Sequence, residues 1–283
     1  MGTLYMNTIE LSLIIAAGSL LAGFLGALTG LGGGVVIVPM LTLAFGIDIR
    51  YAIGASLVSV IATSSGAAAA YVKEGYSNIR VGMFLEIATT IGALTGTAIA
   101  LRLPLRVIAV IFGLVLMYSA YLSWREDKDS PASQGSDRLA KWLRMDGTYP
   151  TGDGLQHYQV QHVPMGFGLM YLAGMLSGLL GIGSGAVKVL AMDKAMRLPF
   201  KVSTTTSNFM IGVTAAASAG IYLNRGYIDP ALAMPVMLGV LAGSLAGARV
   251  LAGARVRTLR LIFSIVIALL GVEMIFNGLK GRI

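Results

Sequence analysis

Two short glycine-rich sequences interrupt apolar segments of this chain and are where we expect its chemistry. They read GLGGG at residues 30–34 and GIGSG at residues 181–185. Glycine inside a helix costs about 1 kcal/mol relative to alanine, so each sequence predicts a helix break. Irregular backbone within a bilayer is tolerated only where protein or a water-filled cavity satisfies its polar groups. Because the N-terminus of a helix favours negative charge, the two breaks predict a binding site for a small anion.

The predicted substrate-binding residues lie at the two breaks and in the segments that follow them. They are Gly30, Gly32, Gly33, Gly34 and Ser56 in the first half, and Gly181, Gly183, Ser184, Gly185, Lys188, Ser207 and Asn208 in the second. The Ser184 hydroxyl and the Asn208 amide can donate hydrogen bonds to an oxyanion. Lys188 stands in an apolar run, so we expect it to face a cavity or a carboxylate, or else to extend to the interface. Close helix packing is the other explanation of the glycines.

Glu86 is the one carboxylate well inside a predicted membrane span. An acidic side chain at such a position is a functional hypothesis by default, and we take Glu86 as the candidate proton carrier. The alternative is an ion pair with Arg80 or Lys73 near the interface.

Other kinds of site find little support in the sequence. The chain has no cysteine, and two histidines without acidic companions at ligand spacing predict neither a metal site nor a cofactor. It contains no Ser-His-Asp set, HExxH or Walker motif, so we expect no enzymatic activity.

The composition predicts a polytopic membrane protein of the all-α class. Hydrophobic residues make up 56% of the 283 residues and charged residues 12%, and the mean hydropathy is +0.79. Soluble domains carry about 25% charged residues. The net charge of +8 is explained by basic cytoplasmic loops, which argues against a nucleic-acid partner and leaves lipid as the surroundings. Residues 1–10 lack a basic region typical of a cleavable signal peptide, so the first apolar segment is expected to be a mature span.

The apolar segments fall into two sets of five around a polar interval. Segments of roughly membrane length are predicted at residues 9–28, 51–72, 81–101 and 105–122, and again at 164–180, 202–223, 231–251 and 259–276. A shorter piece follows each glycine sequence, at residues 35–45 and 186–196. We therefore expect a first transmembrane repeat at 1–123, a polar central loop at 124–163 and a second repeat at 164–283. A linker is favoured over an ordered cap for the loop, with a short strand at 158–163.

The two halves are copies of each other. A shift of 151 positions places Gly30, Gly32 and Gly34 on Gly181, Gly183 and Gly185. Without a gap it also places Ser56 on Ser207, Thr63 on Thr214, Gly75-Tyr76 on Gly226-Tyr227, and Gly92 and Gly96 on Gly243 and Gly247. Five crossings per half make the copies inverted and put more than twice as many Lys and Arg residues on one side as on the other. Four crossings give equal numbers, so the positive-inside rule favours five, with a cytoplasmic central loop and both termini outside.

With these residues in view, the chain resembles the TauE/SafE family of membrane permeases, also called sulfite exporters or the TSUP family. The resemblance is carried by AGFLGALTGLGGGVVIVPML at residues 22–41 and AGMLSGLLGIGSGAVKVLAM at residues 173–192. The second copy departs from the motif at Ser184, Lys188 and Leu190. The resemblance implies outward, proton-coupled movement of sulfite, sulfonates or related organic anions across the inner membrane.

We therefore expect a secondary active transporter of a small anion, built from two inverted repeats of about five helical segments, or 8–10 spans, with broken helices at the glycine motifs. The anion would rest between the two breaks, and protons would be the coupling ion. A passive anion channel is the alternative within transport. An intramembrane enzyme or a scaffold is the alternative outside it, and assembly into a homo-oligomer is compatible with each.

Overall fold

The protein is helical almost throughout, in the computed structural model that describes residues 8–29, 34–73, 76–124, 137–151, 154–251 and 256–281. One two-stranded sheet is the only strand structure in these ranges. The predicted all-α class is confirmed.

The helices of the two halves follow the same order. The first half consists of α1 (Thr8–Thr29), α2 (Gly34–Pro39), the π-helix η1 (Met40–Ala44), α3 (Ile49–Lys73), α4 (Ile79–Ala100) and α5 (Leu105–Trp124). The second consists of α7 (Val163–Leu180), α8 (Gly185–Leu190), the π-helix η2 (Ala191–Ala195), α9 (Phe200–Asn224), α10 (Pro230–Leu251) and α11 (Val256–Lys280). The predicted segments match these bounds within two residues, apart from α11.

Three helices of the described chain are long and apolar enough to cross a membrane by themselves. They are Ile79–Ala100, Val163–Leu180 and Pro230–Gly247. Shorter apolar helical stretches occur at Glu10–Leu25, Gly34–Ala44, Ile49–Ser65 and Leu105–Tyr121. Length and composition therefore support a membrane protein and leave the number of crossings as a prediction.

A π-helix follows the short helix in each half. In the first half Pro39, which has no backbone N–H to donate, precedes η1. In the second half Leu190 stands at the equivalent place, and η2 forms there all the same. The wider helical turn therefore does not depend on the proline. Single π-turns are rare and occur frequently at functional sites.

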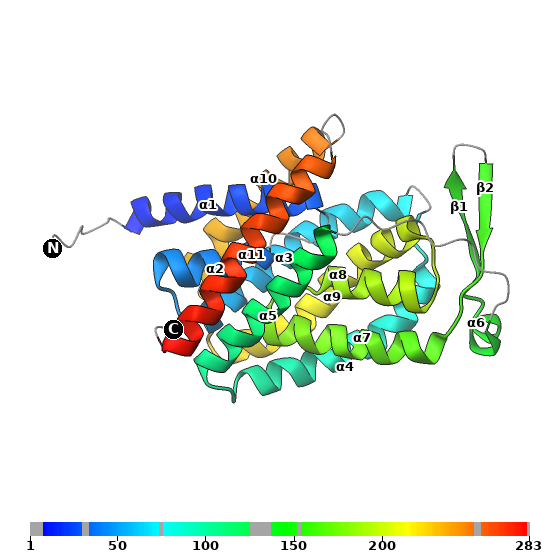
Figure 1. The fold of residues 1–283 in the computed structure, drawn as a ribbon, viewed down its shortest axis with the longest axis horizontal. Coiled ribbons are helices and arrows are strands. Elements are labelled where there is room, and N and C mark those ends of the chain that lie inside the picture. Colours follow the sequence, from blue (N-terminus) through cyan, green and yellow to red (C-terminus); the bar gives the residue numbers. More distant parts are fainter. Residues whose placement is uncertain are drawn as a thin grey trace. The chain divides into compact units, whose positions relative to one another are not determined.

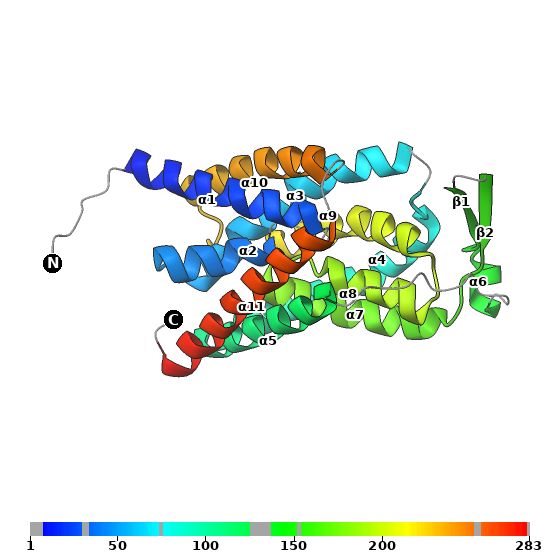
Figure 2. The same cartoon turned by 45° about the horizontal axis from the view of Figure 1, so that its top comes forward.

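The chain forms two compact units, and each unit takes helices from both halves of the sequence. The first unit comprises Met1–Val60, Pro104–Trp124 and Tyr222–Ile283; the second comprises Ile61–Leu103 and Arg125–Ile221. In the first unit α1 packs along α10, which Figure 2 shows in blue and orange, and α5 packs along α11. In the second unit α4 packs along α7, as Figure 1 shows.

Two of these three helix pairs, α1–α10 and α4–α7, are held together by the same close glycine contact. In α1–α10, a side chain at Gly23 would collide with the backbone oxygen of Val240. In α4–α7, a side chain at Gly174 would collide with the backbone oxygen of Thr89. The shift of 151 positions relates Gly23 to Gly174 and Thr89 to Val240, so one packing solution occurs twice. Such small-residue contacts let membrane helices approach closely.

The central segment forms an ordered cap on the second unit. It contains α6 (Arg138–Trp142) and a hairpin of β1 (Gly147–Thr151) and β2 (Gly154–Tyr158), paired with Gly147 opposite Tyr158. In Figure 1 the cap lies where α7 begins. The linker interpretation is therefore wrong for residues 137–151 and 154–163. The expected strand at 158–163 is wrong as well, because β2 ends at Tyr158 and α7 starts at Val163.

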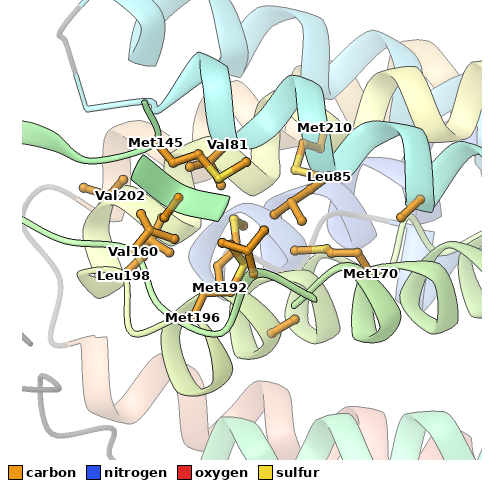
Figure 3. Close-up of a cluster of buried hydrophobic side chains, with 14 of the residues drawn as sticks. Val81, Leu85, Met145, Val160, Met170, Met192, Met196, Leu198, Val202 and Met210 are labelled. Carbon is orange, nitrogen blue, oxygen red and sulfur yellow. The ribbon is translucent and has the colours of Figure 1, made fainter. Parts of the chain in front are cut away.

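Apolar and hydrogen-bonded contacts attach the cap to the second unit. Met145 and Val160 join one buried cluster with Met192 of η2 and Met210 of α9 (Figure 3). Asn78 begins α4: its side-chain oxygen accepts from the backbone N–H of Val81 at 3.0 Å. The Asn78 amide also donates to the Met145 carbonyl at 2.7 Å and to the Tyr158 hydroxyl at 2.8 Å. One side chain thus caps a helix and fixes the hairpin.

Candidate functional site

The second glycine sequence breaks the helix, as predicted. Helix α7 ends at Leu180, and Gly181 closes it with φ +68°, donating its N–H to the Ser177 carbonyl at 2.8 Å. Gly183 and Ser184 also have left-handed backbones, with φ +72° and +48°, before α8 starts at Gly185. This conformation has no steric cost for glycine, but it is strained for the side chain of Ser184.

All five residues of this break are buried in the structure. The break is therefore enclosed by protein, and the cavity that we expected beside it stays a prediction. Ser184 is 3% exposed, and its hydroxyl has no hydrogen-bond partner within the described part of the chain. A buried hydroxyl is normally hydrogen-bonded, so Ser184 offers an unused donor at the break.

Lys188 follows Ser184 by one helical turn, because its backbone N–H donates to the Ser184 carbonyl at 3.0 Å. The Lys188 side chain is completely buried, so it does not extend to an aqueous interface. Its Nζ donates to Thr214 Oγ1 of α9 at 2.6 Å. Burying an ammonium group is costly unless it is paired and hydrogen-bonded. Thr214 supplies the hydrogen bond and connects Lys188 to a carboxylate partner.

Glu86 of α4 is that partner. Thr214 Oγ1 donates to Glu86 Oε1 at 2.8 Å, so one hydroxyl joins the ammonium group to the carboxylate. Thr90 donates to the same oxygen at 3.2 Å. The other oxygen, Oε2, is buried without a hydrogen-bond partner among the described residues.

The alternative explanation of Glu86, an ion pair with Arg80, is wrong. Arg80 donates instead to the Arg144 carbonyl of the cap at 3.1 Å. The side chain of Lys73, the other proposed partner, lies outside the described residues. Glu86 is thus joined to a lysine 102 positions away in the sequence, within the same compact unit.

Thr214 is the member of this group that sequence reasoning missed. It is completely buried on α9, two turns after Ser207. The signal available was its place in the repeat, where it coincides with Thr63. Threonines in membrane helices often bond only to the preceding turn, so this match did not single it out.

The other predicted residues are distributed as follows. Ser207 is buried and donates to the Gly185 carbonyl at 3.3 Å, so its hydroxyl closes on the break, and Asn208 is half-buried beside it on α9. Gly34 and Ser56 are buried in the first unit. Gly30, Gly32 and Gly33 lie outside the described residues.

The second unit thus combines a buried cation, a buried anion and a connecting hydroxyl beside a helix break. Described residues take up one of the three Lys188 ammonium donors. The remaining donors and the Ser184 hydroxyl suit the oxygen atoms of a small oxyanion. Charge-assisted hydrogen bonds of this kind are about twice as strong as neutral ones.

Comparison with known proteins gives a consistent result. The family described as Sulfite exporter TauE/SafE matches residues 15–274. The probable membrane transporter protein YunE of Bacillus subtilis (strain 168) is 27% identical over 273 residues, which cover 94% of this chain and 98% of that protein. A probable membrane transporter protein of Methanocaldococcus jannaschii is 24% identical, covering 94% of this chain and 95% of its own length. No solved structure matches the chain.

Proposed function

The chain belongs to the sulfite exporter TauE/SafE family of membrane transporters, and on that basis we propose that it is a secondary active transporter of a small anion such as sulfite or an organosulfonate. It would work in the inner membrane and export the anion when the internal concentration is high. The second break holds the anion, through Lys188, Ser184 and the polar start of α9 around Ser207 and Asn208. Glu86 carries the coupling proton.

The observation that carries this proposal is the fully buried Lys188 at a helix break. A positive charge enclosed by apolar helices is expensive unless it serves a function, and here an unused hydroxyl lies one turn away. Its burial also favours a carrier over a passive channel, because an open pore would leave the ammonium group in contact with water.

We propose in addition that the two halves are inverted repeats, with boundaries at 1–123 and 164–283 and the cap between them. The matching order of helices supports this arrangement. So does the recurrence of the Gly23–Val240 contact as Gly174–Thr89. Inverted repeats with broken helices are a common architecture of secondary transporters.

The test is the flux of radiolabelled sulfite into proteoliposomes across an imposed pH gradient. We expect uptake that saturates with sulfite and responds to the gradient. Lys188→Met, which keeps the length and removes the charge, should lower uptake by at least about tenfold, in line with the loss of a hydrogen bond to a charged group. Lys141→Met, on the exposed face of α6, is the matched control and should behave as wild type.

Three outcomes would count against the proposal. Uptake without saturation or pH dependence would indicate a passive channel. Absence of uptake for sulfite and organosulfonates alike would remove the anion class. Wild-type uptake by Lys188→Met would remove the site.

A further inference from the structure

We propose that Thr214 is a hydroxyl switch that makes anion binding at Lys188 depend on protonation of Glu86, so that one proton travels with each monoanion. This inference rests on the proposed function and adds its coupling mechanism. Its starting point is the chain of two hydrogen bonds from Lys188 through Thr214 to Glu86.

The Thr214 hydroxyl has one hydrogen and two acceptors within reach. Glu86 Oε1 lies at 2.8 Å, and the Met210 carbonyl of the preceding turn lies at 2.9 Å. When Glu86 is charged, the carboxylate is the stronger acceptor and takes the hydrogen. When Glu86 is neutral, the carbonyl can take it without movement of any heavy atom. The Thr214 oxygen accepts from Lys188 in both positions, but it is the stronger acceptor while its own hydrogen is donated to the charged carboxylate, because hydrogen bonds in a chain polarise one another. Protonation of Glu86 therefore loosens the hold of Thr214 on the ammonium group and leaves that group to the anion.

Glu86 has an oxygen suited to receive the proton. Oε1 already accepts from Thr214 and Thr90, whereas Oε2 is buried with no partner in the described part of the chain. A proton from the aqueous phase would bind to Oε2, and Lys188 would keep its own proton throughout. The site therefore gains one positive charge when Glu86 is protonated, and a monoanion on Lys188 restores neutrality.

The charge of each state explains the coupling. The empty site contains the Lys188 cation and the Glu86 anion and is neutral. The fully loaded site contains the Lys188 cation, neutral Glu86 and the monoanion and is also neutral. A site loaded with only the proton or only the anion carries a net charge, which is costly to enclose among apolar helices. Only the empty site and the fully loaded site, which are neutral, can therefore pass through the conformation in which the site is enclosed.

Within the described part of the chain, one charged group acts on Glu86. Lys188 on α8 is the charged group that acts on it, and Thr214 of α9 with Thr89 and Thr90 of α4 contribute hydroxyls. Another buried carboxylate, Asp193 of η2, is paired with Lys194 at 3.0 Å.

The test measures binding of ethanesulfonate to the purified protein by calorimetry as a function of pH. Ethanesulfonate stays a monoanion across the whole range, so any pH dependence belongs to the protein. One proton taken up per anion predicts that affinity rises roughly tenfold for each unit of pH lowered, above the titration of Glu86. The companion measurement is flux in proteoliposomes, which should take up one proton per ethanesulfonate and ignore a membrane potential.

Three variants separate the switch from a structural role. Thr214→Val keeps the shape and removes the hydroxyl, and should reduce the pH slope of binding to less than half of the wild-type slope. Thr214→Ser keeps the hydroxyl and should restore the slope. Thr90→Val removes the other side-chain hydroxyl that donates to Glu86 Oε1 but leaves the link to Lys188, and should keep the slope. If Thr214→Val fails to fold, Thr214→Ala takes its place.

Failure of this inference is distinguishable from failure of the proposed function. A wild-type slope in Thr214→Val, with intact binding and flux, would overturn the switch alone. Equal loss of slope in Thr90→Val would also overturn it, because any hydroxyl near Glu86 would then suffice. Wild-type protein that neither binds nor transports the anion would overturn both.

Discussion

Ile37 and Lys188 occupy the same place in the two halves of the chain, and both are completely buried. Each lies three residues into the short helix after a glycine sequence. One is a hydrocarbon and the other a cation. Ile37 needs no partner, whereas Lys188 requires Thr214 and Glu86. In the repeat Met237 of α10 corresponds to Glu86, so the acid and the base are both absent from the equivalent positions of the first unit.

The difference separates the parts of the repeat that both units share from the residues of the candidate site. The glycine contacts between long helices occur in both units, with Gly23 matching Gly174. The charged residues occur once. Packing is therefore shared between the halves, and the ionic chemistry belongs to the second unit.

The largest expected effect comes from making the second unit resemble the first. Lys188→Ile removes the charged donor of the site, and anion flux in proteoliposomes should fall about 100-fold. The double variant with Glu86→Met also removes the buried carboxylate, which would otherwise have lost its lysine partner. Replacing a buried ion pair by apolar residues is often neutral or stabilising by about 1–4 kcal/mol, so the double variant should unfold at or above the wild-type temperature in detergent while remaining inactive. Wild-type flux in the double variant would contradict the comparison.

The reverse exchange should damage the fold. Ile37→Lys places a cation where the position equivalent to Glu86 holds Met237 and therefore provides no acid. The expected loss of stability is about 3 kcal/mol, the cost of lysine at the centre of a membrane helix. Thermal unfolding in detergent measures it, with Ile37→Val as the apolar control. A stable Ile37→Lys protein would mean that the first unit also holds a partner for a buried charge.

The shared packing predicts equal effects in the two halves. Gly23→Ala and Gly174→Ala each force a methyl group against a backbone oxygen, and each should lower stability by about 2 kcal/mol. Gly168→Ala on α7 is the matched control, because nothing lies within 4 Å of the added methyl group, and it should be neutral or stabilising. Clearly unequal losses at positions 23 and 174 would show that the halves are not packed alike.

The smallest effect concerns the cap, which only the second unit carries. Asn78 and Asp229 are equivalent and both begin a helix, Asp229 by accepting from the Ala231 N–H at 2.9 Å. Asn78 has in addition an amide that reaches Tyr158. Tyr158→Phe removes this hydrogen bond and should cost about 1 kcal/mol, read from thermal unfolding at neutral pH.

The same tyrosine predicts a pH dependence. Burial raises the pKa of Tyr158 to about 12, so the folded cap keeps the phenolic proton over a range in which the unfolded chain loses it. The stability that this provides is complete below about pH 10, the ordinary pKa of tyrosine, and is lost as pH rises towards 12. Tyr158→Phe should flatten that part of the pH profile. An unchanged alkaline profile in the variant would place the titration elsewhere.

Sequence patterns located the helices because membrane helices leave a clear mark in composition. The bounds of α7 and α9 were predicted within two residues from apolar length alone. The strand was expected at residues 158–163, and the hairpin was missed because its position depends on contacts with Asn78 and Met145 that sequence spacing does not encode.

The site was predicted in part for the same reason. Lys188 and Glu86 stand out individually as charges in apolar segments. Their connection depends on which faces of α4, α8 and α9 meet, and Thr214 alone resembles any other threonine in a membrane helix. The shift of 151 positions reveals equivalent residues but not which of them touch.

Ser184 has a practical consequence for further structural work. Its left-handed backbone at φ +48° costs about 1 kcal/mol that a glycine, such as Gly33 at the equivalent position, would not incur. Ser184→Gly therefore offers a more heat-resistant sample for crystallisation, at the loss of one hydroxyl. The difference in unfolding temperature between this variant and the native chain would measure how much thermal stability Ser184 costs the protein.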